Sequence, residues 1–395
     1  MPALILKAGR EKSLLRRHPW IFSGAIQQVD GEPVSGGTVD LLSSNRQFLA
    51  RASYSPTSQI RARVWTFLPN EPVDAEFFRR KIRAAIETRQ RLGIASQPNA
   101  FRLVYAESDG IPGLIVDRYG EVLVLQSLTA GSEFWKETLA DLLLEETGLS
   151  TIYERSDADV RELEGLDPKV GLLRGNLSSL VFPITEHNRQ FNVNLETGHK
   201  SGFYLDQRTN RLRAGELANG KDVLDCFCYT GGFTINALDG GAKSVLSIDS
   251  SAEALILAKQ NIELNNLPVE KTNFLEGDVF QLLRKFRDEN RSFDMIILDP
   301  PKFAPTAAQV ERAARAYKDI NLLAFKLLRP GGILVTFSCS GGVEAGLFQK
   351  IIAGAALDAG VDAQIVEHLS QGCDHPVLLH FPEGAYLKGL ICIKK

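Results

Sequence analysis

Cysteine, methionine and histidine are scarce in this sequence. Its 395 residues include 5 Cys, 2 Met and 6 His. The cysteines are odd in number and contain no Cys-x-x-Cys pair, so neither a disulfide framework nor a zinc knuckle is indicated. The histidines show no metal-ligand spacing, and we therefore predict that the protein binds no metal.

Long apolar runs and phosphate-binding glycine patterns are also absent. No window approaches the roughly 18–20 apolar residues of a membrane span. The apolar run that follows Met1 is far too short for a secretory signal. These absences predict a cytoplasmic, reduced protein. The turn at 225–233 lacks both the G-x-G-x-x-G spacing that seats a pyrophosphate and the lysine of a P-loop, so dinucleotides and nucleoside triphosphates fit it poorly.

The length and the charge distribution indicate more than one module. A chain of 395 residues with 44% hydrophobic and 24% charged residues is typical of a globular protein with two or three domains. The net charge is −3, yet residues 1–65 hold nine Lys and Arg against four acids, which leaves −8 for the remainder. This asymmetry predicts either a basic module for a polyanion or a solvated face without a partner.

Turn residues and strand patterns divide the chain into three parts. Residues 1–72 contain short strand-like runs between Gly and Pro turns, which predicts a small β-barrel. Residues 73–182 open with a helical pattern at 74–94 and continue as α+β, with a further helix at 132–146. In the part from 183 to 395, helical segments alternate with strands, which predicts a doubly wound α/β sheet with strands at 222–226, 244–249, 272–275, 293–298, 333–337 and 362–366. We expect the last strand, 385–393, to be antiparallel because no crossover helix precedes it.

Acidic residues follow three successive strands of that sheet. Asp225 opens a turn with two late glycines, which leaves room for a small cationic ligand. Asp249 is placed to accept both hydroxyls of a ribose, and Asp278 and Val279 are placed for an exocyclic amine and a purine face. An Asp at a strand end is often only a helix N-cap. Together, however, the four positions predict an adenosine site that fits S-adenosylmethionine.

Two runs at the ends of the next strands carry reactive groups. Asp-Pro-Pro-Lys follows one strand at 299–302, and Ser-Cys-Ser follows the next at 338–340. Open parallel sheets bind ligands at that edge. A thiolate at Cys339 can attack C6 of a pyrimidine, after which C5 can accept a methyl group. We predict that Asp299 hydrogen-bonds the edge of the base and that Pro300 and Pro301 keep the backbone rigid. Lys302 is predicted to bind a phosphate, and Phe303 to stack on the base.

The reactive residues also have structural alternatives. A free cysteine is often a small buried hydrophobe, but the position of Cys339 beside an Asp-Pro-Pro strand end favours a nucleophile. Cys373, in a polar loop, is a weaker candidate. Packing roles are expected for the remaining cysteines, Cys226, Cys228 and Cys392. No general base is evident, and satisfied surface positions are predicted for the two candidates, His375 and Glu383.

Five stretches give the whole chain a resemblance to a known family: 9–20, 198–208, 228–233, 299–303 and 337–341. They resemble the bacterial ribosomal RNA large subunit methyltransferase I family, class I S-adenosylmethionine-dependent enzymes that make 5-methylcytosine in 23S rRNA. Ser201 and Phe203 stand where Thr and Tyr would equally be expected. The resemblance implies a PUA domain at 1–72, a central α+β domain at 73–182 and a Rossmann-like methyltransferase domain at 183–395.

The resemblance also implies the ligands and their contacts. The cofactor is S-adenosylmethionine, the partner is large-subunit ribosomal RNA, bare or partly assembled, and a homodimer is left open. Cys339 would attack a flipped-out cytosine, with Asp299 and Pro300 completing the catalytic set. Cofactor contacts are implied for Asp225, Phe227, Tyr229, Thr230, Gly231, Asp249, Ser250, Asp278, Val279, Asp299 and Arg208. RNA contacts are implied for Arg10, Lys12, Arg16, Arg17, Trp20, Lys302 and Phe303.

Two other functions fit the same residues. An exocyclic-amine methyltransferase acting on adenine N6 or guanine N2 would use the Asp-Pro-Pro turn and need no thiol, so Cys339→Ala would leave it active. A non-catalytic RNA-binding assembly factor would keep the methyltransferase fold but fail to bind S-adenosylmethionine.

Overall fold

The computed structural model describes residues 1–94, 99–198, 200–303 and 309–395. The chain forms two compact units. The first comprises Met1–Ile184, Val193–Leu205 and Cys373–Gly384, and the second comprises Thr185–Asn192, Asp206–Gly372 and Ala385–Lys395. Within the described ranges, none of the helices has the length and apolar character needed to cross a bilayer. His199, which belongs to the 198–208 stretch, lies outside the described residues.

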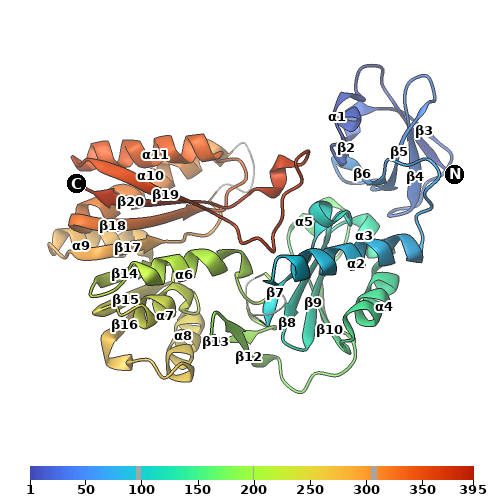
Figure 1. Ribbon diagram of the computed structural model, residues 1–395. Coiled ribbons are helices and arrows are strands. Elements are labelled where there is room, and N and C mark those ends of the chain that lie inside the picture. The colour runs from blue at the N-terminus through green and yellow to red at the C-terminus, as the bar shows by residue number, and fades with distance from the viewer. Residues whose placement is uncertain (95–98, 199, 304–308) are drawn as a thin grey trace. The chain divides into compact units, whose positions relative to one another are not determined.

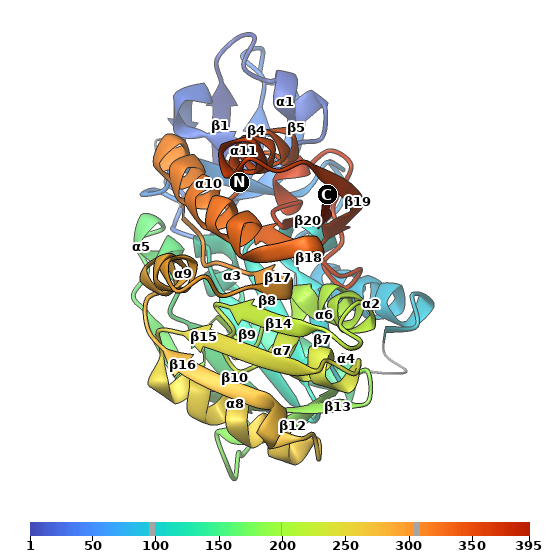
Figure 2. The same ribbon diagram turned by 90° about the vertical axis from the view of Figure 1, so that its left-hand side faces the viewer.

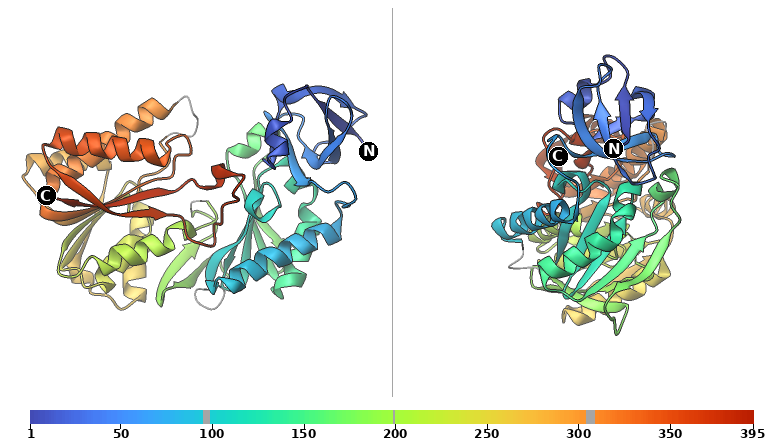
Figure 3. Two further views of the ribbon diagram at one scale, coloured as in Figure 1. Left: turned by 45° about the horizontal axis from the view of Figure 1, so that its top comes forward. Right: turned by 90° about the vertical axis from the view of Figure 1, so that its right-hand side faces the viewer.

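The N-terminal part of the first unit is a six-stranded β-sheet, as the turn-rich sequence predicts (Figure 3). Val39 and Leu41 are fully buried while their neighbours are partly exposed, which is the period-2 pattern of strands with one face in a core. The short helix α1 (Lys12–Leu15) adds Leu14 to that core. In spatial order the strands are β2 (Trp20–Phe22), β6 (Ile60–Thr66), β5 (Phe48–Tyr54), β4 (Thr38–Leu42), β1 (Ala3–Leu6) and β3 (Ile26–Asp30).

A five-stranded sheet with two long helices forms most of the remaining first unit. Helix α2 (Ala75–Arg91) begins where the Asp74 carboxylate accepts a hydrogen bond from the backbone N–H of Phe77, and it buries Phe77, Phe78 and Ile82. The helix predicted at 132–146 is two helices, α3 (Ala130–Phe134) and α4 (Lys136–Thr147). The strands, in order, are β11 (Lys169–Arg174), β10 (Thr151–Ser156), β9 (Val122–Ser127), β8 (Leu114–Tyr119) and β7 (Ala100–Tyr105).

Residues 373–384 complete the first unit, although they lie far along the chain. The carbonyl of Asp374 accepts a hydrogen bond from Arg89 Nη2 at 2.8 Å, and its carboxylate accepts one from the backbone N–H of Arg102 at 3.0 Å. The ring of Phe381 packs edge-on against Trp20, with 4.8 Å between ring centroids. Buried hydrogen bonds and an aromatic contact therefore fix this segment within the first unit.

The second unit is built on a seven-stranded sheet (Figure 2). Strands β16, β15, β14, β17 and β18 are parallel, whereas β20 runs antiparallel to both of its neighbours, which confirms the prediction for the last strand. The order is β16 (Thr272–Glu276), β15 (Ser244–Asp249), β14 (Asp222–Cys226), β17 (Phe293–Leu298), β18 (Leu328–Ser338), β20 (Lys388–Lys394) and β19 (Ala363–Ser370). Strands β12 (Val181–Glu186) and β13 (Arg189–Asn194) form a separate two-stranded sheet.

Helices cover both faces of this sheet (Figure 1). Helices α9 (Val279–Asp288), α10 (Val310–Leu327) and α11 (Ala345–Ala359) pack on one face, where they share a core with Leu224 and Cys226 of β14. Helices α6 (Arg208–Glu216), α7 (Gly232–Asp239) and α8 (Ala252–Leu264) lie on the other. Because successive strand residues alternate between faces, Asp225 points to the α7 side.

Candidate active site

Asp225 is a buried carboxylate at the end of β14. Its side chain is fully buried, and Oδ2 accepts a hydrogen bond from the Thr234 hydroxyl of α7 at 2.7 Å. Within the described chain, Oδ1 has no hydrogen-bond partner, and neither does the buried hydroxyl of Thr230. Burial raises the pKa of Asp225 to about 7, and the charges of Asp299 and Asp249 contribute in the same direction. The end of β14 and the turn after it therefore hold unsatisfied polar atoms and an excess of negative charge.

The turn after β14 has an unusual backbone. Phe227, Tyr229 and Gly231 have φ values of 61°, 49° and 80°, in the left-handed region that non-glycine residues rarely adopt. Such conformations persist where surrounding contacts hold them, and they are frequent at functional sites. Here, the backbone N–H of Tyr229 donates to Asp249 Oδ2 at 2.8 Å. The strained turn is thus tied to the end of the neighbouring strand β15.

The carboxylates at the ends of β15 and β16, Asp249 and Asp278, accept hydrogen bonds from backbone N–H groups. Asp249 Oδ1 accepts from the backbone N–H of Ser251 at 2.9 Å, so both oxygens of Asp249 accept main-chain donors. Ser250 is exposed. Asp278 caps α9 by accepting from the backbone N–H of Gln281 at 3.0 Å, and it remains exposed. Val279 is only 4% exposed because it packs in the α9–α11 core, which leaves little of it for a purine.

Gln207 joins the site; it belongs to the 198–208 stretch of the family resemblance, but sequence analysis gave it no role of its own. Its Nε2 donates to Asp299 Oδ1 at 2.8 Å, and its Oε1 accepts from Asn210 Nδ2 at 2.6 Å. Arg208, the expected neighbour of the cofactor, begins α6 and is buried. The available signal was the position of Gln207 directly before Arg208 in the 198–208 stretch.

The Asp-Pro-Pro turn follows β17. Asp299 is half-buried and Pro300 is buried, whereas Lys302 is exposed. The ring of Phe303 is half-buried and packs against Tyr317, with centroids 4.8 Å apart. Part of the ring that sequence analysis assigned to base stacking is therefore used in packing.

Cys339 follows directly after the end of β18. It is half-exposed, whereas Cys226, Cys228 and Cys392 are buried as expected. Burial raises the pKa of Cys392 to about 12 and those of the Cys226 and Cys228 thiols well above their ordinary value. Cys339 is therefore the accessible thiol of the second unit. The remaining cysteine, exposed Cys373, belongs to the first unit.

Lys388 lies beside Cys339, and sequence reasoning missed this residue as well. Its ammonium donates to the carbonyls of Ser340 and Tyr386, both at 2.7 Å, and its Cα is paired with that of Ser338 across the β18–β20 ladder. Burial lowers the pKa of Lys388 to about 8, while the negative charge of Cys339 opposes this effect and Lys302 adds to it. A cation thus stands next to the half-exposed thiol.

The basic residues predicted for RNA lie mainly on the surface of the first unit. Arg10, Lys12, Arg16 and Arg17 are exposed, and none of them has an ion-pair partner among the described residues. Trp20 is half-buried, and its indole N–H donates to Glu107 Oε1 at 2.7 Å. The two candidate bases also lie in the first unit: Glu383 is paired with His18 at 3.2 Å, and His375 is 2% exposed beside Asp374. His375 is therefore buried rather than on the surface.

Comparison with known proteins identifies the modules. Residues 4–67 match the model of a PUA-like domain, and residues 170–377 match the model of an S-adenosylmethionine-dependent methyltransferase. The chain is thus a methyltransferase of that cofactor class with an N-terminal PUA-like domain. It is 53% identical to the ribosomal RNA large subunit methyltransferase I of Yersinia pseudotuberculosis over 98% of each protein. The chain therefore belongs to the ribosomal RNA large subunit methyltransferase I family.

Solved structures share the fold over the entire chain. An S-adenosylmethionine-dependent methyltransferase from Streptococcus mutans aligns with a TM-score of 0.86 at 21% identity, covering 100% of each chain. A methyltransferase complexed with SAH aligns with a TM-score of 0.87 at 21% identity and the same coverage. The multidomain α/β architecture predicted from the sequence is confirmed.

The residues of the site fit the cofactor of this class. The unsatisfied oxygens of Asp225 and Thr230 offer acceptors, and the negative charge at the turn suits a cationic sulfonium. No group of His, Cys, Asp and Glu among the described residues is arranged to hold a metal ion.

Proposed function

We propose that the protein methylates C5 of a cytosine in 23S ribosomal RNA, with Cys339 as the covalent nucleophile. The observation that carries the proposal is the place of this half-exposed thiol. It follows β18, which pairs with β17, the strand that leads to the Asp299 turn. On the other side of β17 lies β14, which carries the carboxylate Asp225 one residue before its end. The resemblance of the whole chain to enzymes of this specificity supports the same chemistry.

The chemistry needs the thiol because C5 of cytosine is a poor nucleophile. The Cys339 thiolate forms a bond to C6, which makes C5 electron-rich as part of an enamine. S-adenosylmethionine, when bound, supplies an electrophilic methyl group. Loss of the C5 proton to a base then restores the C5–C6 double bond and expels the Cys339 thiolate. The base then passes this proton to solvent, and the enzyme returns to its starting state.

The surrounding residues have distinct proposed roles. Lys388 stabilises the Cys339 thiolate because a neighbouring cation favours the charged form of a thiol. Asp299 hydrogen-bonds the cytosine edge, with Gln207 holding its carboxylate, and Pro300 keeps that turn rigid. The proposed cofactor contacts are those predicted from the sequence. They include Arg208, the 225–231 turn, and the carboxylates Asp249, Asp278 and Asp299.

RNA recognition is assigned to the basic surface of the first unit. Arg10, Lys12, Arg16 and Arg17 supply positive charge for the phosphate backbone, and Lys302 lies near the reactive turn. A target C5 inside a stacked helix is unreachable, so the cytosine must flip out at a cost of about a few kcal/mol. Bare or partly assembled rRNA should therefore be a better substrate than the finished subunit, and the reaction belongs in the cytoplasm. We also propose that the chain has three functional domains: the PUA domain at 1–72, the central α+β domain at 73–182 and the methyltransferase domain at 183–395.

Cys339→Ala tests the mechanism. The variant should bind S-adenosylmethionine but form no 5-methylcytosine, as measured by mass spectrometry of the RNA product. RNA that contains 5-fluorocytidine should form a covalent adduct with the wild type, because fluorine at C5 prevents the elimination step, and no adduct with the variant. Full methylation by Cys339→Ala would contradict covalent catalysis.

One observation favours a second candidate. The Asp299 carboxylate, held by Gln207 at 2.8 Å, can also accept hydrogen bonds from the exocyclic amine of a purine. An amine methyltransferase on this turn would need no thiol. Retained methylation by Cys339→Ala, with the methyl group found at adenine N6 or guanine N2, would establish this alternative.

A further inference from the structure

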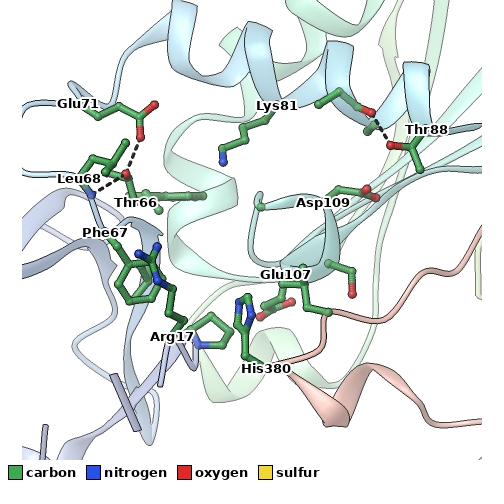
Figure 4. A pocket seen from close by; sticks show the side chains of 18 residues that line it. Arg17, Thr66, Phe67, Leu68, Glu71, Lys81, Thr88, Glu107, Asp109 and His380 are labelled. Atoms are coloured by element: carbon green, nitrogen blue, oxygen red, sulfur yellow. Dashed lines mark hydrogen bonds between the residues drawn. The ribbon is translucent and has the colours of Figure 1, made fainter. Parts of the chain in front are cut away.

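A cavity of about 530 Å³ is lined by residues of the first unit. Its walls come from the α1–β2 loop, the end of β6, helix α2, the turn at 107–110 and the 373–384 segment (Figure 4). Segments that are distant in sequence thus build one hollow. Pockets of roughly 300–1,000 Å³ are the usual size for small-molecule and cofactor sites, and a single nucleotide is a ligand of this class.

The carboxylates around this cavity are held by other partners. Glu71 accepts from the Thr66 hydroxyl at 2.5 Å and from Arg80 at 3.0 Å. Asp109 accepts from Arg89 at 2.7 Å and from the backbone N–H of Tyr105 at 2.6 Å. Glu107 is bonded to the Trp20 indole at 2.7 Å and lies 3.8 Å from Arg63. Their negative charge is therefore largely compensated by donors of the protein itself.

Three basic side chains line the same cavity without such partners. Arg17, Lys81 and His380 form no ion pair and no side-chain hydrogen bond with any residue in the described part of the chain. Figure 4 shows Lys81 reaching into the hollow from α2, with Arg17 and His380 on the opposite side. Two of these side chains, Arg17 and Lys81, carry positive charge, and the indole N–H of Trp65, which also lines the cavity, has no hydrogen-bond partner among the described residues. Cations and free donors of this kind favour an anion.

One wall of the cavity carries a cation–π pair. The Arg17 guanidinium lies over the ring of Phe67, 5.1 Å from its centroid, and Leu68, Pro19 and Leu378 add apolar surface nearby. Guanidinium planes and aromatic rings both stack on nucleobases, and such stacking contributes to single-stranded RNA binding. A guanidinium–aromatic pair beside the Lys81 ammonium matches a ligand with a planar base and a phosphate.

We propose that this cavity binds one nucleotide of the RNA substrate, separate from the cytosine that is methylated. Arg17, Lys81 and His380 take the phosphate, and the base stacks on the Arg17–Phe67 wall. The inference rests on the proposed function only in taking RNA as the ligand. It assigns α2 and the 373–384 segment, neither of which belongs to the PUA-like fold, a direct part in RNA binding.

The test is RNA affinity in the Cys339→Ala background, so that failure of the methylation chemistry leaves it unaffected. Fluorescence anisotropy with a labelled single-stranded fragment of large-subunit rRNA would compare Lys81→Gln, Lys81→Glu and His380→Ala with the parent. Each neutral variant should bind about 3–10-fold more weakly, and Lys81→Glu more weakly still. The salt slope should decrease by about one for each phosphate that a variant no longer binds.

Arg91→Ala is the matched control, because Arg91 lies on the same helix with an 80% exposed side chain and is not part of the cavity. It should bind RNA within about twofold of the parent. Circular dichroism melts would establish that each variant is folded. If another variant does not fold, the comparison rests on Lys81→Gln, which nearly preserves side-chain volume. Equal affinity of the Lys81 and His380 variants and Arg91→Ala would overturn the proposal.

Competition distinguishes the sources of the phosphate. Cytidine 5′-monophosphate at millimolar concentration should weaken RNA binding by the parent more than inorganic phosphate does, and should have less effect on Lys81→Glu. Equal competition by inorganic phosphate would overturn the nucleotide assignment in favour of a simple anion site.

Discussion

Replacing Lys388 by methionine should slow the alkylation of Cys339 about tenfold at pH 7. The Lys388 ammonium is fixed by two carbonyls at 2.7 Å, one of which belongs to Ser340, the residue after Cys339. With two of its three protons engaged, the third is available to the thiolate. Methionine keeps the length and apolar character of the stem but removes the charge together with the two hydrogen bonds to the carbonyls.

The expected tenfold change follows from the charge state of Lys388 and the exposure of Cys339. With a pKa of about 8, Lys388 is a cation in about nine of ten molecules at pH 7. An opposite charge within about 4–6 Å favours an ionised group by about 1–3 pKa units. Because Cys339 is half-exposed, solvent screening places the effect at the lower end of that range. One unit corresponds to a tenfold change in the thiolate fraction.

The assay is the rate of iodoacetamide alkylation of Cys339, followed by mass spectrometry from pH 5 to 10. In Lys388→Met, the midpoint of the rate profile should move upward by about one unit. Lys388→Arg should retain the wild-type profile at low pH. Because the pKa of Lys388 is lowered, the wild type loses this cation as the pH rises through about 8, whereas the Arg variant does not.

The matched control is Lys394→Met on the same strand. Lys394 also donates to two backbone carbonyls, those of Phe325 and Leu328, but it lies at the opposite end of β20 from Lys388. Its loss should leave Cys339 alkylation unchanged. Identical profiles for Lys388→Met, Lys394→Met and the wild type would refute a role for Lys388 in thiolate stabilisation.

Two further predictions concern binding and stability. The double variant Arg16→Ala, Arg17→Ala should weaken RNA binding and flatten its dependence on salt, while S-adenosylmethionine affinity, measured by calorimetry, should stay unchanged. Equal loss of both affinities would contradict the assignment of these two arginines to RNA binding. Glu186→Gln should lower the free energy of unfolding by about 3 kcal/mol, because it removes the charge of Glu186, both of whose oxygens accept hydrogen bonds from the buried Arg211 guanidinium. Urea unfolding would measure this loss, and a change below about 1 kcal/mol would contradict it.

The sequence predicted the parallel core of the second unit well because its signals are local. β14, β15 and β17 are short apolar runs between helical segments, and their bounds agree with the predicted ones. β18 begins at Leu328, five residues before the predicted start, because the strand continues through Pro330 and two glycines that are typical of turns. Its pairing with the last strand, which no local pattern encodes, extends over Ile333–Ser338.

The parts of the site that escaped prediction depend on long-range contacts. Gln207 meets Asp299 across 92 residues of chain, and Lys388 meets Ser340 across 48. Neither residue type at those positions indicates chemistry on its own. The 373–384 segment likewise looked like a loop of the C-terminal domain, yet its buried contacts lie in the first unit. Local patterns place strand ends and their carboxylates, whereas the partners that hold those groups emerge only from the tertiary fold.

Asp225 should make stability depend on pH in an unusual direction. The pKa of Asp225 is about 7 in the folded protein and near 3.8 in the unfolded chain. Between pH 3.8 and 7, the folded protein therefore holds more protons than the unfolded one. The free energy of unfolding should therefore fall as the pH rises from about 4 to 7, by up to ~4 kcal/mol. Asp225→Asn should lack this component, and parallel pH profiles for the two proteins in urea unfolding would contradict it.

The same buried carboxyl should couple cofactor binding to proton release. A sulfonium or ammonium group near Asp225 favours the ionised carboxylate, so binding of S-adenosylmethionine should expel the proton that Asp225 holds in the free protein. With a pKa of about 7, about half a proton should be released at pH 7 and more at pH 6. Calorimetry in buffers with different ionisation enthalpies measures the number directly. Asp225→Asn should bind more weakly and release none of this proton, and equal release by both proteins would show that the cofactor does not act on Asp225.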